Sequence, residues 1–289
     1  MIDRLKCQLT CSVFLLIFGW IGPLYSASDT VIPAFDHSLY DQLLSQYVQK
    51  GWVDYENLKN HREPLDQYVA LLGDLSEVTY SLMTNREKIA FWINAYNAIT
   101  LQIVLDHYPI TSSTLSGLAA PKNSIRQIPG AWNKITRHVK GEAMTLDHIE
   151  HEILRREFHI PQVHMALVCA SQSCPPLRRE AYIGEQLIKQ LDDQSKVFLS
   201  LSSNLRMDDE KHQVYLSAIF NWFGKDFLPG DGPKEPAFLN QKERAVINFV
   251  IEYAPDEIRQ FLIENQYQIK YLDYDWTLND VKEKPNNAD

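Results

Sequence analysis

Residues 84–97 read TNREKIAFWINAYN, and this stretch decides the fold. Thr84 and Glu87 stand three residues apart, which is the spacing of a capping box, where each side chain accepts a backbone N–H at the start of a helix. From Lys88 to about His107, apolar residues occupy almost every face of a helix, and Pro109 follows. A helix that is apolar all round is buried, so the sequence predicts a central helix here.

Two amide side chains, Asn94 and Asn97, lie within this predicted helix. Buried amides need hydrogen-bond partners. We therefore expect them either to fix neighbouring backbone or to orient a catalytic side chain.

Outward from this helix, the chain combines further helices with a few short strands. Apolar residues recur at helical spacing over 39–48, 63–75, 146–158, 183–198, 218–223, 239–253 and 255–265. The stretches 205–207 and 214–216 flank a polar turn and predict a hairpin, and 268–276 predicts a final strand. With no repeat or clear linker, we expect an α+β fold, a helix-rich single domain packed around a small, mainly antiparallel sheet.

The first 28 residues have the pattern of a secretory signal peptide. Arg4 and Lys6 precede an apolar stretch at 12–25, and the small residues 26–28 offer a cleavage site. The alternative is an uncleaved membrane anchor, but the apolar run is shorter than the ~20 residues that a span requires. We expect residues 29–280 to form the globular domain, 281–289 to be a disordered tail, and the mature protein to be periplasmic or secreted.

The chain of 289 residues has a formal charge of −9. Residues 1–28 carry two basic and one acidic side chain, so the predicted mature chain has a charge of −10. An acidic surface argues against nucleic acid or an anionic membrane as the main partner. The sequence gives no oligomeric state.

A second informative stretch, 164–176, reads HMALVCASQSCPP. Residues 163–168 are mostly apolar and predict a short buried strand. Small and polar residues then predict a loop, which Pro175 and Pro176 end. Cys174 is therefore expected on a loop beyond a core strand, where a rigid scaffold can aim a reactive group.

The predicted helix at 146–158 carries Glu150 at the edge of its apolar face, with His151 beside it. Adjacent residues of an α-helix point about 100° apart, so the two side chains can serve one small site only at the helix edge. A carboxylate at this position is either paired or has a shifted pKa. Trp132, Trp222 and Trp276 are expected as walls of the core or of a cleft.

Four blocks of the sequence carry a family resemblance. They are FWINAYNA at 91–98, LDHIEHEILR at 146–155, the stretch 164–175, and YDWTLN at 274–279. Together they resemble the domain of unknown function 547 family over roughly 52–279, which implies a single globular module, here of an exported, bacterial type. The family has no established activity, so the resemblance assigns no roles to the residues in its blocks: Asn94, Asn97, Glu150, His151, His164, Cys169 and Cys174.

The first functional hypothesis is a cysteine-dependent hydrolase or transferase acting on amide or ester bonds of a peptide-like substrate. The Cys174 thiolate would be the nucleophile, and His151 or His164 would lower the thiol pKa from about 8.5 and act as the base. His151 is the favoured base because it lies at a helix edge. Glu150 or an asparagine would orient the histidine, and backbone N–H groups near Ser173 would form an oxyanion hole.

Two other hypotheses use the same residues. In the second, Cys169 and Cys174 form a structural disulfide, the simplest pairing for the two cysteines of an exported chain, and the domain binds a ligand or partner without catalysis. In the third, the two cysteines join His151 and His164 in a zinc site, although no CxxC pair supplies the usual spacing. We expect no other cofactor.

Overall fold

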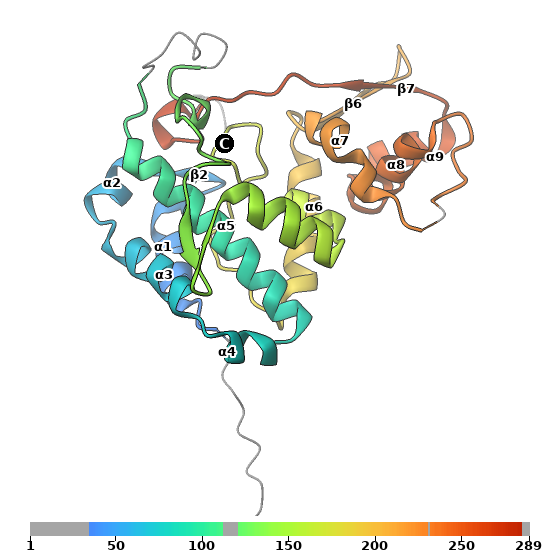
Figure 1. Cartoon of the computed structure of the whole chain (residues 1–289). Coiled ribbons are helices and arrows are strands. Elements are labelled where there is room, and N and C mark those ends of the chain that lie inside the picture. The colour runs from blue at the N-terminus through green and yellow to red at the C-terminus, as the bar shows by residue number, and fades with distance from the viewer. Residues whose placement is uncertain (1–34, 112–120, 231, 285–289) are drawn as a thin grey trace, which may run out of the picture. The chain divides into compact units, whose positions relative to one another are not determined.

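The structure, a computed structural model, describes residues 35–111, 121–230 and 232–284 (Figure 1). The predicted signal peptide, residues 1–28, lies outside the described residues, and so does the predicted tail from residue 285. Val281–Glu283, which the sequence analysis assigned to that tail, form a 3-10 helix, η6. Among the described residues, no helix is both long and apolar enough to cross a bilayer.

Helices dominate the described chain. The α-helices are α1 (Ser38–Tyr47), α2 (Tyr55–Asn60), α3 (Glu63–Asp74), α4 (Glu77–Leu82), α5 (Asn85–His107), α6 (Leu187–Ser200), α7 (Ala218–Phe223), α8 (Gln241–Tyr253) and α9 (Asp256–Glu264). The 3-10 helices besides η6 are η2 (Ile125–Gln127), η4 (Pro161–Met165) and η5 (Gly224–Phe227), and the π-helix is η3 (His148–Phe158).

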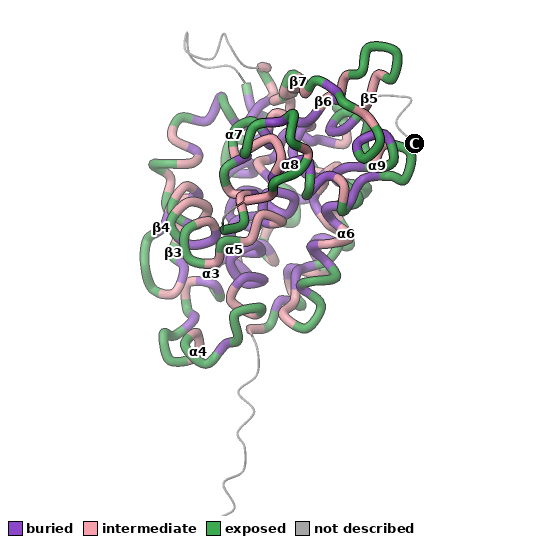
Figure 2. Tube along the Cα trace, turned by 90° about the vertical axis from the view of Figure 1, so that its right-hand side faces the viewer, coloured by how far each residue is buried: buried purple, intermediate pink, exposed green. Residues whose placement is uncertain are grey.

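Helix α5 is the centre of the fold, as predicted. Its capping box is present: Thr84 Oγ1 accepts the Glu87 N–H at 3.3 Å, and Glu87 Oε2 accepts the Thr84 N–H at 2.7 Å. Every residue from Ile89 to Leu105 is buried (Figure 2). Helices α2, α3, α6 and η3 all contact α5, so this helix organises the part of the molecule that carries the candidate residues.

The strands of the described chain form three small sheets. β1 (Val48–Gln49) pairs with β2 (Trp52–Val53), and β3 (Arg137–Val139) pairs with β4 (Glu142–Met144), both antiparallel. In the third sheet, β5 (Leu205–Asp208) and β6 (Gln213–Leu216) form the predicted antiparallel hairpin, and β7 (Gln268–Tyr271) joins β6 in parallel. The predicted helix-rich α+β class with mainly antiparallel pairing is confirmed, although a helix and not a sheet lies at the centre.

The predicted buried strand at 163–168 is wrong. Pro161–Met165 form the 3-10 helix η4, and the extended residues that follow belong to no strand of the described chain. The segment is buried as expected, but Asn97 takes the place of a neighbouring strand. Its Nδ2 donates to the carbonyl of Ala166 at 3.0 Å, and its Oδ1 accepts the N–H of Val168 at 2.9 Å. A buried side-chain amide thus satisfies backbone groups that a sheet would otherwise satisfy.

Two hydrophobic clusters fill the interior of the described chain. The first surrounds α5, and the second joins the end of α6 with α7, α8, α9 and the β5–β6–β7 sheet. Tyr274, in the extended segment after β7, packs against both clusters. The place where the clusters meet is where the candidate residues gather.

Candidate functional site

A cavity of about 210 Å³ collects five of the candidate site residues and the three tryptophans expected as wall residues. Glu150, His151, His164, Cys169 and Cys174 all line it. The aromatic residues of its wall are Tyr96, Trp132, Trp222, Phe223, Tyr274 and Trp276. Residues that are far apart in the chain therefore form one small, largely aromatic pocket.

Glu150 is held by the central helix. Its side chain is 12% exposed, and its Oε2 atom accepts a hydrogen bond of 3.1 Å from the hydroxyl of Tyr96. Burial, together with the Glu150 carboxylate, raises the pKa of Tyr96 well above its ordinary value, so this phenol stays a donor. The other carboxylate oxygen, Oε1, is 3.9 Å from His151 Nδ1, which is beyond hydrogen-bond range. One oxygen is thus fixed by Tyr96, while the other accepts no hydrogen bond from the described residues.

The π-helix explains how Glu150 and His151 serve one pocket. The helix was expected to be α-helical, with adjacent side chains about 100° apart. In the structure His148–Phe158 follows i→i+5 hydrogen bonding, so the helix is wider and turns less per residue. Both side chains consequently reach the same cavity, and π-helical turns are often found at functional sites.

His151 does not have the geometry of the predicted base. Arg155 Nη1 lies 2.8 Å from His151 Nδ1, and because arginine can only donate, Nδ1 must be the acceptor. A neutral ring then carries its proton on Nε2, whose nearest carboxylate oxygen, on Asp147, is 3.9 Å away. The lone pair that a base would use is therefore already engaged.

His164, which also lines the pocket, is hydrogen-bonded to a network that includes Asp226 and Arg155. Its Nε2 lies 2.8 Å from Asp226 Oδ2, and Asp226 also accepts hydrogen bonds from Arg155. Burial raises the pKa of Asp226, but the hydrogen bonds and charges of His164 and Arg155 outweigh burial and hold it below its ordinary value. The His164 ring also stacks on Phe223 at 4.4 Å. The hydrogen bond to Asp226 joins η4 to η5 and occupies Nε2, one of the two ring nitrogens of His164.

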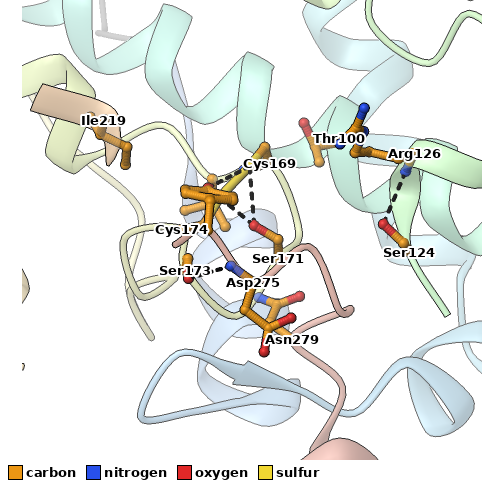
Figure 3. Close-up of a disulfide and its surroundings, with 12 residues drawn as sticks. Thr100, Ser124, Arg126, Cys169, Ser171, Ser173, Cys174, Ile219, Asp275 and Asn279 are labelled. Carbon is orange, nitrogen blue, oxygen red and sulfur yellow. Dashed lines mark hydrogen bonds between the residues drawn. A yellow bond between two sulfur atoms is a disulfide. The ribbon is translucent and has the colours of Figure 1, made fainter. Parts of the chain in front are cut away.

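Cys169 and Cys174 form a disulfide (Figure 3). The predicted nucleophile is therefore absent from this structure, because the Cys174 sulfur is bonded to Cys169 and carries no thiolate. The alternative prediction, a disulfide between these two cysteines, matches the structure. Ser171 lies beside both sulfurs in the same loop, with its Oγ 3.5 Å from Cys169 Sγ.

The zinc hypothesis stays a prediction, and three of its four ligands have other partners in this structure. Two of its four ligands are bonded to each other, and the Nε2 of a third, His164, faces Asp226. Within the described ranges, no group of three or more His, Cys, Asp or Glu side chains is placed to hold a metal ion.

Comparison with protein families places much of this site in one domain. The model of the family described as "Protein of unknown function, DUF547" matches residues 80–199. Residues 80–199 are a DUF547 domain. The match spans α5, η3, η4, the disulfide loop and α6. Neither the curated proteins nor the solved structures contain a match to this chain.

Part of the pocket comes from outside the DUF547 match. Trp222 lies in α7, and Tyr274 and Trp276 lie in the segment after β7. That segment is bound to the disulfide loop through backbone hydrogen bonds: the N–H of Gln172 donates to Thr277 O at 2.8 Å, and the N–H of Asn279 donates to Ala170 O at 3.3 Å. The DUF547 domain and the later segment therefore complete one site.

The three predicted supporting residues outside the cavity wall fix backbone. Asn94 exchanges hydrogen bonds with the carbonyl and the N–H of Tyr182, at 2.8 and 3.0 Å. Asn97 fixes the chain just before Cys169, as described above. Ser173 Oγ accepts the N–H of Asp275 at 2.9 Å (Figure 3). Of the two roles left open for the asparagines, the structural role agrees with the geometry.

Sequence reasoning missed Tyr96 and Tyr274 as wall residues. Tyr274 Oη contacts both sulfurs, 3.1 Å from Cys174 Sγ and 3.3 Å from Cys169 Sγ. The signal that could have found it is its place in the YDWTLN block, since the blocks that the DUF547 resemblance groups together also meet in space.

Proposed function

We propose that the pocket is a binding site for a small organic cation, such as an alkylammonium group or the end of a lysine or arginine side chain of a peptide-like ligand. The observation that carries this proposal is the composition of the wall. Six aromatic side chains and the carboxylates of Asp147 and Glu150 line the cavity, and no lysine or arginine is among the described residues that do so.

Three neighbouring aromatic side chains of the wall offer ring faces to a cation. Trp222 lies 4.8 Å from Tyr274 and 6.0 Å from Trp276, measured between ring centroids. Trp222 is 48% exposed, which is unusual for so large an apolar residue. The Arg126 guanidinium lies 5.1 Å from the centroid of the Trp276 ring. One member of the group thus already attracts a cation within the chain.

Glu150 supplies the counter-charge deeper in the pocket. Its Oε1 atom has no hydrogen-bond partner among the described residues, while Oε2 is held by Tyr96. The volume of about 210 Å³ is below the roughly 300–1,000 Å³ of pockets for drug-sized ligands. We therefore infer that the pocket holds a group of a few heavy atoms and is too small for a drug-sized molecule.

The cysteine hydrolase or transferase hypothesis is less well supported by the same geometry. It needs a free Cys174 thiolate and an available base, whereas the sulfur is in a disulfide and His151 Nδ1 accepts from Arg155. The disulfide also supports export of the chain, which we retain as a proposal, because disulfides persist mainly in oxidising compartments.

The test compares choline with its neutral isostere 3,3-dimethyl-1-butanol by calorimetry and by tryptophan fluorescence. The two have the same shape and differ in charge, so the pocket should bind choline about tenfold more tightly. Glu150→Gln should remove this preference, whereas Glu152→Gln, an exposed change on the same helix, should keep it. Equal affinity for both compounds in the unmodified protein would refute the cation proposal.

A further inference from the structure

The two sulfurs of the disulfide have different surroundings. Cys174 Sγ is the acceptor of two hydrogen bonds, from the N–H of Cys169 at 2.9 Å and from the hydroxyl of Tyr274 at 3.1 Å. A sulfur in a neutral disulfide is a weak acceptor, but the same two donors would strongly stabilise a thiolate, since hydrogen bonds to a charged acceptor are stronger.

The hydroxyl of Tyr274 is oriented to donate to sulfur. Ser171 Oγ donates to Tyr274 Oη at 3.1 Å, so the single phenol proton is free to point toward a sulfur. Cys174 Sγ, at 3.1 Å from Tyr274 Oη, is the nearer of the two, since Cys169 Sγ is 3.3 Å away. Burial raises the pKa of Tyr274 above its ordinary value, and the nearby Glu150 carboxylate adds to this. Tyr274 therefore keeps its proton at neutral pH and remains a donor.

Access to the two sulfurs also differs. Cys174 is only 5% exposed, whereas Cys169 is half-buried, and both line the cavity. An incoming thiol would therefore meet Cys169 first, and the sulfur released on that attack would be the one with two donors already in place.

We propose that Cys169–Cys174 is a redox-active disulfide that accepts two electrons from an external dithiol. A thiolate of the dithiol forms a bond to Cys169 Sγ, the Cys169–Cys174 bond breaks, and its electron pair remains on Cys174 as a thiolate. The second thiolate of the dithiol then attacks the mixed disulfide. This closes the disulfide of the donor, which is thereby oxidised, and releases Cys169, which takes a proton from water.

Tyr274 is a positioning residue in this scheme because it stabilises the leaving sulfur. A leaving thiol with a lower pKa departs faster, so the hydrogen bond affects both the pKa of Cys174 and the rate of reduction. A purely structural disulfide would require neither a lowered Cys174 pKa nor an effect of Tyr274 on the rate of reduction. This activity goes beyond cation binding, and its test contains no cation.

The first measurement is the thiolate absorbance of Cys174 against pH, in the full chain with Cys7, Cys11 and Cys169 replaced by serine. We expect a Cys174 pKa at least about one unit below the ordinary value of about 8.5. Tyr274→Phe should raise that pKa by about one unit, a tenfold change in thiolate at neutral pH. Tyr271→Phe, a control on the preceding strand, should leave it unchanged.

The second measurement follows reduction of the disulfide by dithiothreitol in the full chain with Cys7 and Cys11 replaced by serine. Tyr274→Phe should slow reduction about threefold, and glutathione should be trapped on Cys169 and not on Cys174. If Tyr274→Phe does not fold, Ser171→Ala is the second variant. It keeps the phenol but removes the hydrogen bond that orients it, so it should also slow reduction of the disulfide. A Cys174 pKa at or above 8.5, a glutathione adduct on Cys174, or reduction rates equal in all variants would each overturn the proposal.

Discussion

The hydroxyl of Tyr96, on the central helix, donates to Glu150 on the π-helix at 3.1 Å. This contact fixes the carboxylate of the pocket to the most buried element of the fold. Tyr96→Phe should lower the free energy of unfolding by about 1–3 kcal/mol, because a largely buried carboxylate oxygen loses its donor. Denaturant unfolding measures this, with Tyr47→Phe as control, because the Tyr47 hydroxyl accepts only a solvent-exposed hydrogen bond from Gln46. Equal losses in the two variants would contradict the role of the contact.

Asn97→Ala should be more damaging, because it removes both hydrogen bonds to the segment before Cys169. Two buried backbone groups would lose their partner, at a cost of about 2–4 kcal/mol. Asn248→Ala serves as the control, since Asn248 also donates to backbone but at the surface. If thermal melts show Asn97→Ala as stable as Asn248→Ala, the segment has another source of support.

Stability should fall on acidification because of His37. Burial lowers the pKa of His37 from 6.5 to about 4, and Asp36 opposes this only in part. The unfolded chain binds a proton at higher pH than the folded chain does, so stability is full above pH 6.5 and is lost as the pH falls toward 4. The loss is about 3 kcal/mol at most.

His37→Gln should flatten that part of the pH profile, measured as the midpoint of urea unfolding between pH 7 and pH 4. The surface variant His138→Gln should retain the profile of the unmodified chain. A profile that stays steep in His37→Gln would assign the pH dependence to other groups.

Removing an exposed aromatic side chain should weaken cation binding without loss of the fold. Trp222→Ala takes away one ring at the mouth of the pocket and should reduce the affinity for choline about threefold to tenfold. Trp52→Ala, which lines a different cavity, should bind choline as the unmodified protein does. Unchanged affinity in Trp222→Ala, measured by calorimetry, would remove this ring from the site.

The disulfide should also contribute to stability. It closes a short loop, so replacing both Cys169 and Cys174 by serine should cost about 2 kcal/mol through the greater freedom of the unfolded chain. Chemical unfolding of the double variant measures the cost. A double variant as stable as the unmodified chain would show that the hydrogen bonds of the loop are sufficient by themselves.

The parts of the fold that depend on local signals could be predicted from the sequence. The spacing of Thr84 and Glu87 predicted the start of α5, and the apolar residues on all faces of the helix predicted its burial. The 205–216 hairpin and the Ser217 cap, whose Oγ accepts the N–H of Ile219, also follow from neighbouring residues. Each signal lies within a few positions of the structure that it specifies.

The features that the sequence did not predict depend on distant partners. A short apolar run cannot be told from a strand when its backbone is satisfied by Asn97, about 70 residues earlier. The contact of Tyr274 with Cys174 spans 100 residues. The pairing of Arg155 with His151 could, however, be predicted from the sequence, because residues four apart on a helix are neighbours. This spacing indicates that Arg155 can occupy the lone pair of His151 Nδ1.

The order of synthesis has a consequence for the closing segment. Cys169 and Cys174 are translated 105 and 100 residues before Tyr274, so the nascent chain contains both thiols before the phenol that contacts them exists. Oxidation of the pair can therefore precede completion of the pocket. The hydrogen bond from Tyr274 to Cys174 therefore forms last, when the segment after β7 packs against the disulfide loop.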